Sequence, residues 1–321
     1  MLSLMDMLMP EVQFLHEFGL EEVEEDTSPG LAFQSSYCYP CFFEVPSFTN
    51  WLGTEAASAG HQAAYSLHRN FMQHLQFQAK QREIEGGLGG GGGGGGGGRP
   101  RPGETPLSAP PAGGAAASVA SAAERERRWM NKSPFHMLTL EHLFAEYPDA
   151  MVVQTHRPTR DIIVSWFHLI TVEHEGWLGR PLTEAERHRK IGRDHLAFIK
   201  GMVDAAMRFR RENPALASQF VDVRFEDFVS KPLETARLVY AALGVEVPPA
   251  GGEVDKRLRA CRDAQSSRVK ENLARRSSWK LEDFGVTEAE MAEAFGPYED
   301  WAKGLRVVGP SGEGSGSSDG R

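Results

Sequence analysis

The feature that most constrains this chain is a succession of short apolar strand patterns, each followed by a helical pattern, from Arg127 onward. Residues 150–156 ("AMVVQTH") and 220–225 ("FVDVRF") are typical of buried strands, and "RWMN" is expected to form a short strand ending at Lys132. Strands separated by helices at this spacing predict an α/β fold, with a parallel sheet, right-handed crossovers and flanking helices.

Start and stop signals mark the helices between these strands. Ser133 and Pro134 can open one helix, and Pro158 precedes a second. The apolar face of the first is expected at Leu140, Leu143, Phe144 and Tyr147, and that of the second at Ile162, Ile163, Trp166 and Leu169. Capping boxes at Thr183/Glu186 and Thr287/Glu290 predict a long helix through about residue 211 and a last helix, and a helix from Pro232 is expected to stop at Gly244.

Composition divides the chain into four parts. Residues 1–80 are interpreted as an N-terminal helical part, and residues 124–308 as the core. Between them, residues 81–123 contain an unbroken glycine run at 89–98 and a Pro/Ala-rich stretch, which predict a disordered insertion because they cannot bury enough apolar surface. The glycines are not spaced, or followed by Lys and Ser/Thr, as a Walker loop requires. Residues 309–321 are expected to form a disordered tail.

Charge, cysteine content and hydropathy exclude several classes. With 321 residues and a formal net charge of -9, the chain is long enough for one large domain or two small ones, and nucleic acid is not the expected partner. Cys38 and Cys41 have redox-dithiol spacing, but the segment after them is not a helix start, which favours incidental cysteines. The N-terminus lacks the basic region of a signal peptide, and no apolar run is about 18 residues long. No membrane span is therefore expected. The sequence leaves the compartment open, with the cytoplasm as the default.

Two cations follow strand patterns and precede helix starts. Lys132 and Arg157 are therefore expected at the carboxyl ends of strands, where ligands bind in parallel sheets and where helix N-termini favour anions. Ser165 follows Arg157 by eight residues, about two helical turns, so an arginine fork and a hydroxyl could form a phosphate-sized site. The alternatives, a loop lysine without a partner and a surface arginine beside a helix serine, stay open.

His136 lies just inside the helix that Lys132 precedes. A histidine there could take a proton from an acceptor hydroxyl, or it could be a partly buried residue of the helix start. The spacing of His142, His156 and His168 does not form a metal-binding set, and nothing in the sequence requires a metal.

Three blocks resemble the sulfotransferase family, in particular the branch with a Lys-Ser/Asp-Pro motif. They are "RWMNKSPFHMLTLEHLFAEYPDAMVVQTHRPTRDIIVSWFHL", "DVRFEDFVSKPLETARLVYAALGVEV" and "SWKLEDFGVTEAEMAEAFGPY", which together cover about Arg127 to Trp301. The resemblance implies a P-loop-like sheet in three layers. It also implies transfer of a sulfuryl group from 3′-phosphoadenosine 5′-phosphosulfate to a hydroxyl or amine acceptor.

The resemblance also assigns roles to residues. Arg157 and Ser165 would hold the 3′-phosphate, and Phe225 stands where the family usually has a tyrosine beside the adenine. Lys132 matches a lysine that contacts the leaving phosphate or sulfuryl group. His136 approximates the catalytic histidine, at a different spacing from the lysine, and some branches use a glutamate base elsewhere.

One family element is not found in the sequence. No string resembles the 5′-phosphosulfate loop, so the first strand-loop-helix unit is expected to be missing and turnover by this chain is expected to be low. A non-catalytic relic that binds a nucleotide or a partner is therefore the main alternative. A kinase is a second alternative, without a Walker loop or a Mg²⁺-binding motif to support it.

Overall fold

The computed structural model describes residues 39–88, 129–178, 182–247, 249–260, 263 and 279–309. The chain divides into two compact units. The first comprises residues 1–68 and 133–321, and the second comprises residues 69–132. The sheet and most of the helices below belong to the first unit, and the described part of the second consists of the end of α5 and residues 129–132.

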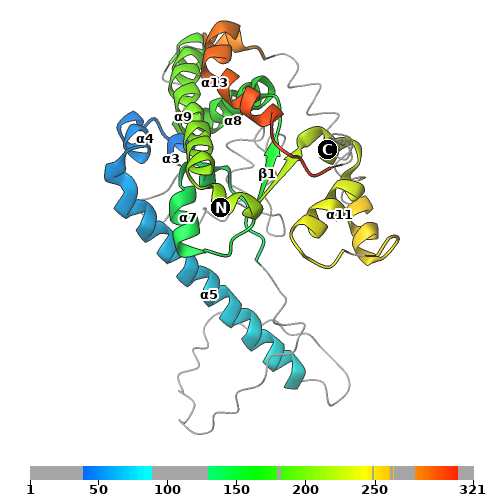
Figure 1. The fold of residues 1–321 in the computed structure, drawn as a ribbon. Helices are drawn as coiled ribbons and strands as arrows, with labels where there is room; N and C mark the ends of the chain where they lie inside the picture. Colours follow the sequence, from blue (N-terminus) through cyan, green and yellow to red (C-terminus); the bar gives the residue numbers. More distant parts are fainter. Residues whose placement is uncertain are drawn as a thin grey trace, which may run out of the picture. The chain divides into compact units, whose positions relative to one another are not determined.

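The described elements are mostly helical (Figure 1). In chain order they are α3 (Tyr39–Phe42), α4 (Pro46–Leu52), η2 (Glu55–Ala57), α5 (Ser58–Leu88), η3 (Pro134–Leu138), α7 (Leu140–Glu146), β1 (Val152–His156), α8 (Thr159–Leu178), α9 (Glu184–Glu212), η4 (Pro214–Gln219), β2 (Phe220–Arg224), α10 (Phe225–Ser230), α11 (Pro232–Ala242), η5 (Leu281–Phe284) and α13 (Glu288–Lys303). None of these helices has the length and apolar character needed to cross a membrane.

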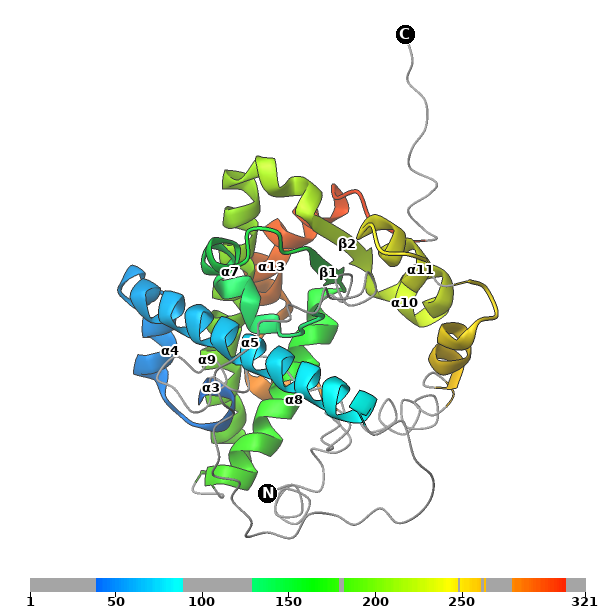
Figure 2. The ribbon, with the colours of Figure 1, turned by 90° about the horizontal axis from the view of Figure 1, so that it is seen from below.

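In the described residues the sheet has two strands, and they are parallel, as predicted for residues 150–156 and 220–225 (Figure 2). Val152 of β1 is paired with Phe220 of β2, and the register continues to His156 opposite Arg224. A parallel bridge between Asp222 and Val307 attaches the chain after α13 to the other side of β2. The α/β character expected from the sequence is therefore confirmed in a small sheet with helices around it.

The predicted strand before Lys132 is wrong for the residues that the structure describes, because 129–133 have no strand conformation. Trp129 and Met130 are 52% and 85% exposed. A short apolar run becomes a strand only where a neighbouring strand and a buried face stabilise it, and these side chains have no such face.

Helix α8 buries a face that overlaps only in part with the one predicted, because Ile163 is in the core and Trp166 packs against it. Ile163, Phe167 and Ile170 are fully buried, whereas Ile162 is 37% exposed. Both stripes of "DIIVSWFHLI" are apolar at helical spacing, so periodicity alone could not choose between them. Trp166 lies at the margin of the core, where its ring N–H donates to His195 Nδ1 at 3.2 Å.

Helix α9 is the element around which the core packs. Thr183 and Glu186 form the predicted capping box at its start, and α9 contacts α8, η3, η5 and α13. At Gly192 the approach of η5 is so close that a Cβ atom would lie 2.2 Å from the Phe284 carbonyl oxygen. Glycine is therefore required at this position by packing rather than by backbone conformation.

The other predicted helix ends are mostly confirmed. Thr287 and Glu290 form the capping box of α13, and Gly244, with a positive φ of 63°, follows α11. The Ser133 hydroxyl accepts a hydrogen bond from the Phe135 N–H, as expected of a cap. The helix that follows is broken in two, because a 3₁₀ turn, η3, ends before α7 begins at Leu140.

Helix α5 continues past Gly86 to Leu88, so the first residues of the predicted insertion are helical. Residues 89–128, which hold the rest of the insertion, lie outside the described residues, as do Cys38 and all of the predicted tail at 309–321 except its first residue. Cys41 is buried.

Candidate functional site

Arg157 and Phe225 leave the carboxyl ends of the two strands together. His156 and Arg224 are the last register partners of β1 and β2, so the next residue of each strand emerges at the same edge of the sheet. The guanidinium carbon of Arg157 lies 4.7 Å from the centre of the Phe225 ring. Both side chains remain partly open to solvent, at 29% for Arg157 and 37% for Phe225. A cation and an aromatic face are therefore presented side by side.

The start of α8 completes this edge. Asp161 Oδ2 lies 3.5 Å from an Arg157 terminal nitrogen, a half-exposed ion pair that contributes little stability but restricts the arginine. Ser165 is half-buried, one further helical turn along α8. Arg157, Asp161 and Ser165 thus follow one another at four-residue spacing along one side of the helix start.

Arg224 is a cation at this edge that the sequence analysis did not single out. It is the last residue of β2, is exposed, and stands in register with His156. The sequence "VRFED" could have indicated this residue, because it places Arg224 at the end of a predicted buried strand, where ligands bind in parallel sheets.

A buried polar network lies beneath Arg157. Arg210 of α9 donates to both carboxylate oxygens of Asp222, each at 2.7 Å, and to the Gln154 side chain at 2.9 Å. His156 Nε2 is 2.8 Å from Asp222 Oδ1, and His156 Nδ1 is 2.8 Å from the Tyr298 hydroxyl. The sequence analysis missed this network, although a charged residue inside the apolar strand "FVDVRF" was a signal for it.

Asp222 of this network stays ionised although it is buried. Burial acts to raise the pKa of Asp222, but the hydrogen bonds from Arg210 and His156 outweigh it and hold that pKa below its usual value. Burial, with the nearby Asp222 charge, raises the pKa of Tyr298 to about 12, so the phenol keeps its proton. The Arg210 guanidinium is also covered by the rings of Phe220 and Trp301, at 4.4 and 4.9 Å.

His136 occupies a separate place, in η3. It is half-buried, and its Nδ1 lies 2.7 Å from the Tyr65 hydroxyl, which is also 2.9 Å from the Thr139 hydroxyl. Among the described residues, no hydrogen bond, ion pair or ring contact joins His136 to Arg157 or Phe225. Lys132 is exposed and belongs to the second unit, at residues 69–132.

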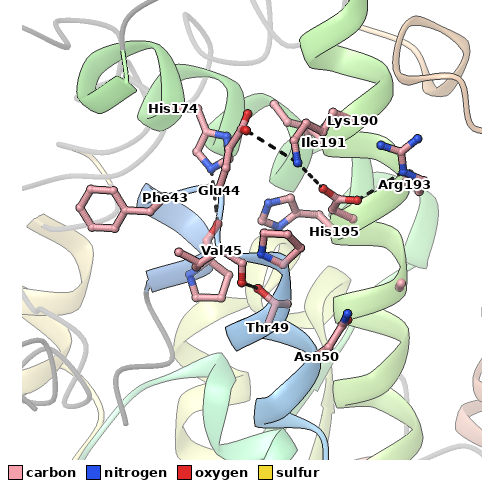
Figure 3. Close-up of a pocket in the computed structure, with 14 residues that line it drawn as sticks. Phe43, Glu44, Val45, Thr49, Asn50, His174, Lys190, Ile191, Arg193 and His195 are labelled. Atoms are coloured by element: carbon pink, nitrogen blue, oxygen red, sulfur yellow. Dashed lines mark hydrogen bonds and ion pairs between the residues drawn. The ribbon is translucent and has the colours of Figure 1, made fainter. Parts of the chain in front are cut away.

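A cavity of about 180 Å³ lies elsewhere in the first unit, between the α3–α4 segment, α8 and α9 (Figure 3). None of the five predicted site residues lines it. The Lys190 ammonium on its wall lies 2.8 Å from Asp194 and 3.7 Å from Glu44. Arg193 lies 3.4 Å from Asp194, so two cations balance the two carboxylates there. Burial, with neighbouring His174, lowers the pKa of His195 to about 3, which makes this ring a poor proton acceptor near neutral pH.

The side chains of the described residues offer no group of three or more His, Cys, Asp or Glu arranged to hold a metal ion. The candidate site is the edge of the sheet at the ends of β1 and β2, where Arg157 and the Phe225 ring are in contact and Ser165 lies on the helix that follows.

Comparison with known proteins gives a match to one family. Searches against curated proteins and solved structures give no significant match. A family model described as "Sulfotransferase family" matches residues 4–249, which include Arg157, Ser165 and Phe225. Because this match spans more than half of the chain, the protein belongs to the sulfotransferase family.

Proposed function

We propose that this chain transfers a sulfuryl group from 3′-phosphoadenosine 5′-phosphosulfate to a hydroxyl or amine acceptor. The observation that carries the proposal is the contact between Arg157 and Phe225 at the carboxyl ends of two adjacent parallel strands. A guanidinium suits a phosphate and an aromatic ring suits a purine, so the two contacting side chains match two parts of one nucleotide.

Arg157 and Ser165 would bind the 3′-phosphate. The planar guanidinium can donate two parallel hydrogen bonds to phosphate oxygens, and the Ser165 hydroxyl can donate a third. The positive end of the α8 dipole favours the same anion. Arg224, at the end of β2, adds positive charge to this edge and strengthens the attraction.

Phe225 would contact the adenine. Arg157 covers part of its ring, and the 37% exposure of the side chain leaves ring surface on which a base can stack. The hydroxyl of the tyrosine usual in the family is absent, so stacking rather than hydrogen bonding would carry this contact.

The chemical step would be an in-line displacement at sulfur. The acceptor oxygen or nitrogen forms a bond to sulfur while the bond from sulfur to the 5′-phosphate oxygen breaks. The electron pair of that bond leaves with adenosine 3′,5′-bisphosphate, and the acceptor proton passes to a base. Positioning and charge stabilisation dominate such transfers, and no metal takes part in this scheme.

His136 would be that base, and Tyr65 would set its tautomer. If the Tyr65 hydroxyl donates to Thr139, it can accept the Nδ1–H of His136, which leaves the imidazole lone pair on Nε2. For Lys132 the proposed role, stabilising negative charge on the departing phosphate, rests on the sequence resemblance alone.

The test is transfer of labelled sulfate from the donor to panels of hydroxyl and amine acceptors. The wild-type chain should label an acceptor, and Arg157→Ala should require a higher donor concentration to do so. Arg208→Ala, which removes an exposed arginine on α9, is the matched control and should behave as wild type. A chain that binds the nucleotide and labels no acceptor would support the non-catalytic alternative. A chain that does not bind the nucleotide would refute the proposed transfer and the nucleotide-binding form of that alternative.

A further inference from the structure

The loop that carries Arg157 is only two residues long, and both of its neighbours are bonded to the same distant helix. His156 ends β1 and Thr159 begins α8, which leaves Arg157 and Pro158 between them. His156 Nδ1 is 2.8 Å from the hydroxyl of Tyr298 on α13. The backbone N–H and hydroxyl of Thr159 donate to Glu299 Oε1, at 3.3 and 2.5 Å. Tyr298 and Glu299 are consecutive residues.

On the strand side, His156 is held at both ring nitrogens. The charged Asp222 carboxylate can only accept, so His156 Nε2 carries the proton that it shares with Asp222. His156 Nδ1 lies 2.8 Å from the Tyr298 hydroxyl, whose pKa of about 12 keeps it protonated. The two rings are also stacked, with centroids 6.0 Å apart. These contacts fix the side chain immediately before Arg157.

On the helix side, Glu299 provides a hydrogen-bond acceptor for the backbone N–H of Thr159 at the start of α8. The first N–H groups of a helix have no partner within it, and a carboxylate there is stabilised by the helix dipole. The half-buried Glu299 carboxylate supplies such a partner to Thr159, which is only 6% exposed. This bond fixes the second residue after Arg157 from the same side as Tyr298.

We propose that Tyr298 and Glu299 are positioning residues for Arg157. By holding both neighbours of the two-residue loop, they keep the guanidinium over Phe225 and directed at the 3′-phosphate. Both residues lie beyond the span 4–249 that matches the family model. The inference rests on the proposed function, because it assumes that Arg157 binds that phosphate.

The experiment compares the affinities of adenosine 3′,5′-bisphosphate and adenosine 5′-monophosphate, measured by calorimetry on the full chain. The ratio of the two affinities isolates the 3′-phosphate contact, and general destabilisation would not change it selectively. Tyr298→Phe and Glu299→Gln should each reduce the preference for the bisphosphate about twofold to thirtyfold, the range expected of a residue that acts through another. Affinity for the monophosphate should be unchanged, and Glu299→Asp should recover part of the preference.

Matched controls exist for both substitutions. Glu293→Gln makes the same change at an exposed position on α13, and Tyr240→Phe makes it at a half-buried position on α11. Both should keep the wild-type preference, and thermal unfolding should show that all variants are folded at the assay temperature.

The outcomes separate the two proposals. If the wild-type chain shows no preference, the proposed function fails and this inference fails with it. Suppose that the wild type prefers the bisphosphate and that Arg157→Ala does not. A Tyr298 or Glu299 variant that retains the preference would then show that the substituted residue does not position Arg157. An equal loss of affinity for both nucleotides would show that the residue has a purely structural role, and would overturn the inference.

Discussion

The Arg157 guanidinium carbon lies 4.7 Å from the centre of the Phe225 ring, although 68 positions separate the two residues in the sequence. The parallel register of β1 and β2 causes this contact, because both residues directly follow the paired ends of their strands. The arrangement distinguishes the roles of the two side chains: removal of the ring should affect every adenine nucleotide, and removal of the cation only those with a 3′-phosphate.

Phe225→Ala should weaken binding of adenosine 5′-monophosphate and of the 3′,5′-bisphosphate by the same factor. Stacking of a base on an aromatic side chain contributes about 1 to 3 kcal/mol, so the expected loss is roughly five- to hundredfold. Phe225→Tyr should retain binding, and Val229→Ala, at a 66% exposed position on the same helix, serves as the control. A loss confined to the bisphosphate, measured by calorimetry, would contradict the assignment of Phe225 to the base.

Substitution by alanine at two glycines of α9 should change the free energy of unfolding in opposite directions. At Gly192 the new methyl group would lie 2.2 Å from the Phe284 carbonyl oxygen, and such overpacking costs about 1 to 3 kcal/mol. At Gly201 no atom lies within 4 Å of the added Cβ, so the better helix propensity of alanine should stabilise by about 0.5 to 1 kcal/mol. Denaturant unfolding measures both, and a stabilised Gly192→Ala variant would refute the close approach of η5.

The buried pair Arg210–Asp222 should be costly to break. Asp222→Asn leaves the guanidinium of Arg210, which is only 11% exposed, without its charged partner, and the expected destabilisation is about 3 kcal/mol. Asp204→Asn is the matched control, because Asp204 pairs with Lys200 at 43% exposure on the surface of α9. That change should cost about 0.5 kcal/mol or less. Similar values for the two variants in urea unfolding would show that the network contributes no more than a surface pair.

Stability should fall as the pH is lowered below about 6.5, and His195 should be one cause. Burial lowers the pKa of His195 to about 3, so between pH 6.5 and 3 the unfolded chain binds a proton at this residue that the folded chain does not. The unfolding free energy therefore decreases with falling pH, by about 1.4 kcal/mol per pH unit for each such group.

His195→Gln should reduce this slope between pH 6.5 and 5. Glutamine can still accept the Trp166 N–H bond through its carbonyl oxygen, so the comparison isolates the titration. His74→Gln, on an exposed histidine of α5, should leave the slope unchanged. Chemical unfolding at several pH values gives the slopes, and identical slopes for wild type and His195→Gln would contradict a buried neutral imidazole.

Local sequence signals predicted the strands and most helix ends, because capping boxes and runs of β-branched residues act over a few positions. The buried face of α8 was predicted only in part: Ile163 is buried as expected, but Ile162 and Phe167 are both apolar and only tertiary packing chooses between them. The strand expected before Lys132 failed for a related reason, because its formation depends on a neighbouring strand that the described residues do not provide.

The candidate site was predictable in part for the same reason. Arg157 and Phe225 each follow a recognisable strand, so their meeting follows from a parallel sheet. Tyr298 and Glu299 contact the neighbours of that loop from 142 and 140 positions away along the chain, and no spacing rule connects them to it.

The central claim is that Arg157 binds a nucleotide 3′-phosphate at the ends of β1 and β2. The most direct measurement is calorimetric titration of wild type, Arg157→Ala and the control Arg208→Ala with adenosine 3′,5′-bisphosphate and adenosine 5′-monophosphate. A hydrogen bond to a charged group contributes about 1.5 to 3 kcal/mol, so Arg157→Ala should weaken the bisphosphate roughly ten- to hundredfold and leave the monophosphate unchanged. Equal wild-type affinity for the two nucleotides, or an Arg157→Ala variant that binds the bisphosphate as tightly as wild type, would contradict the account.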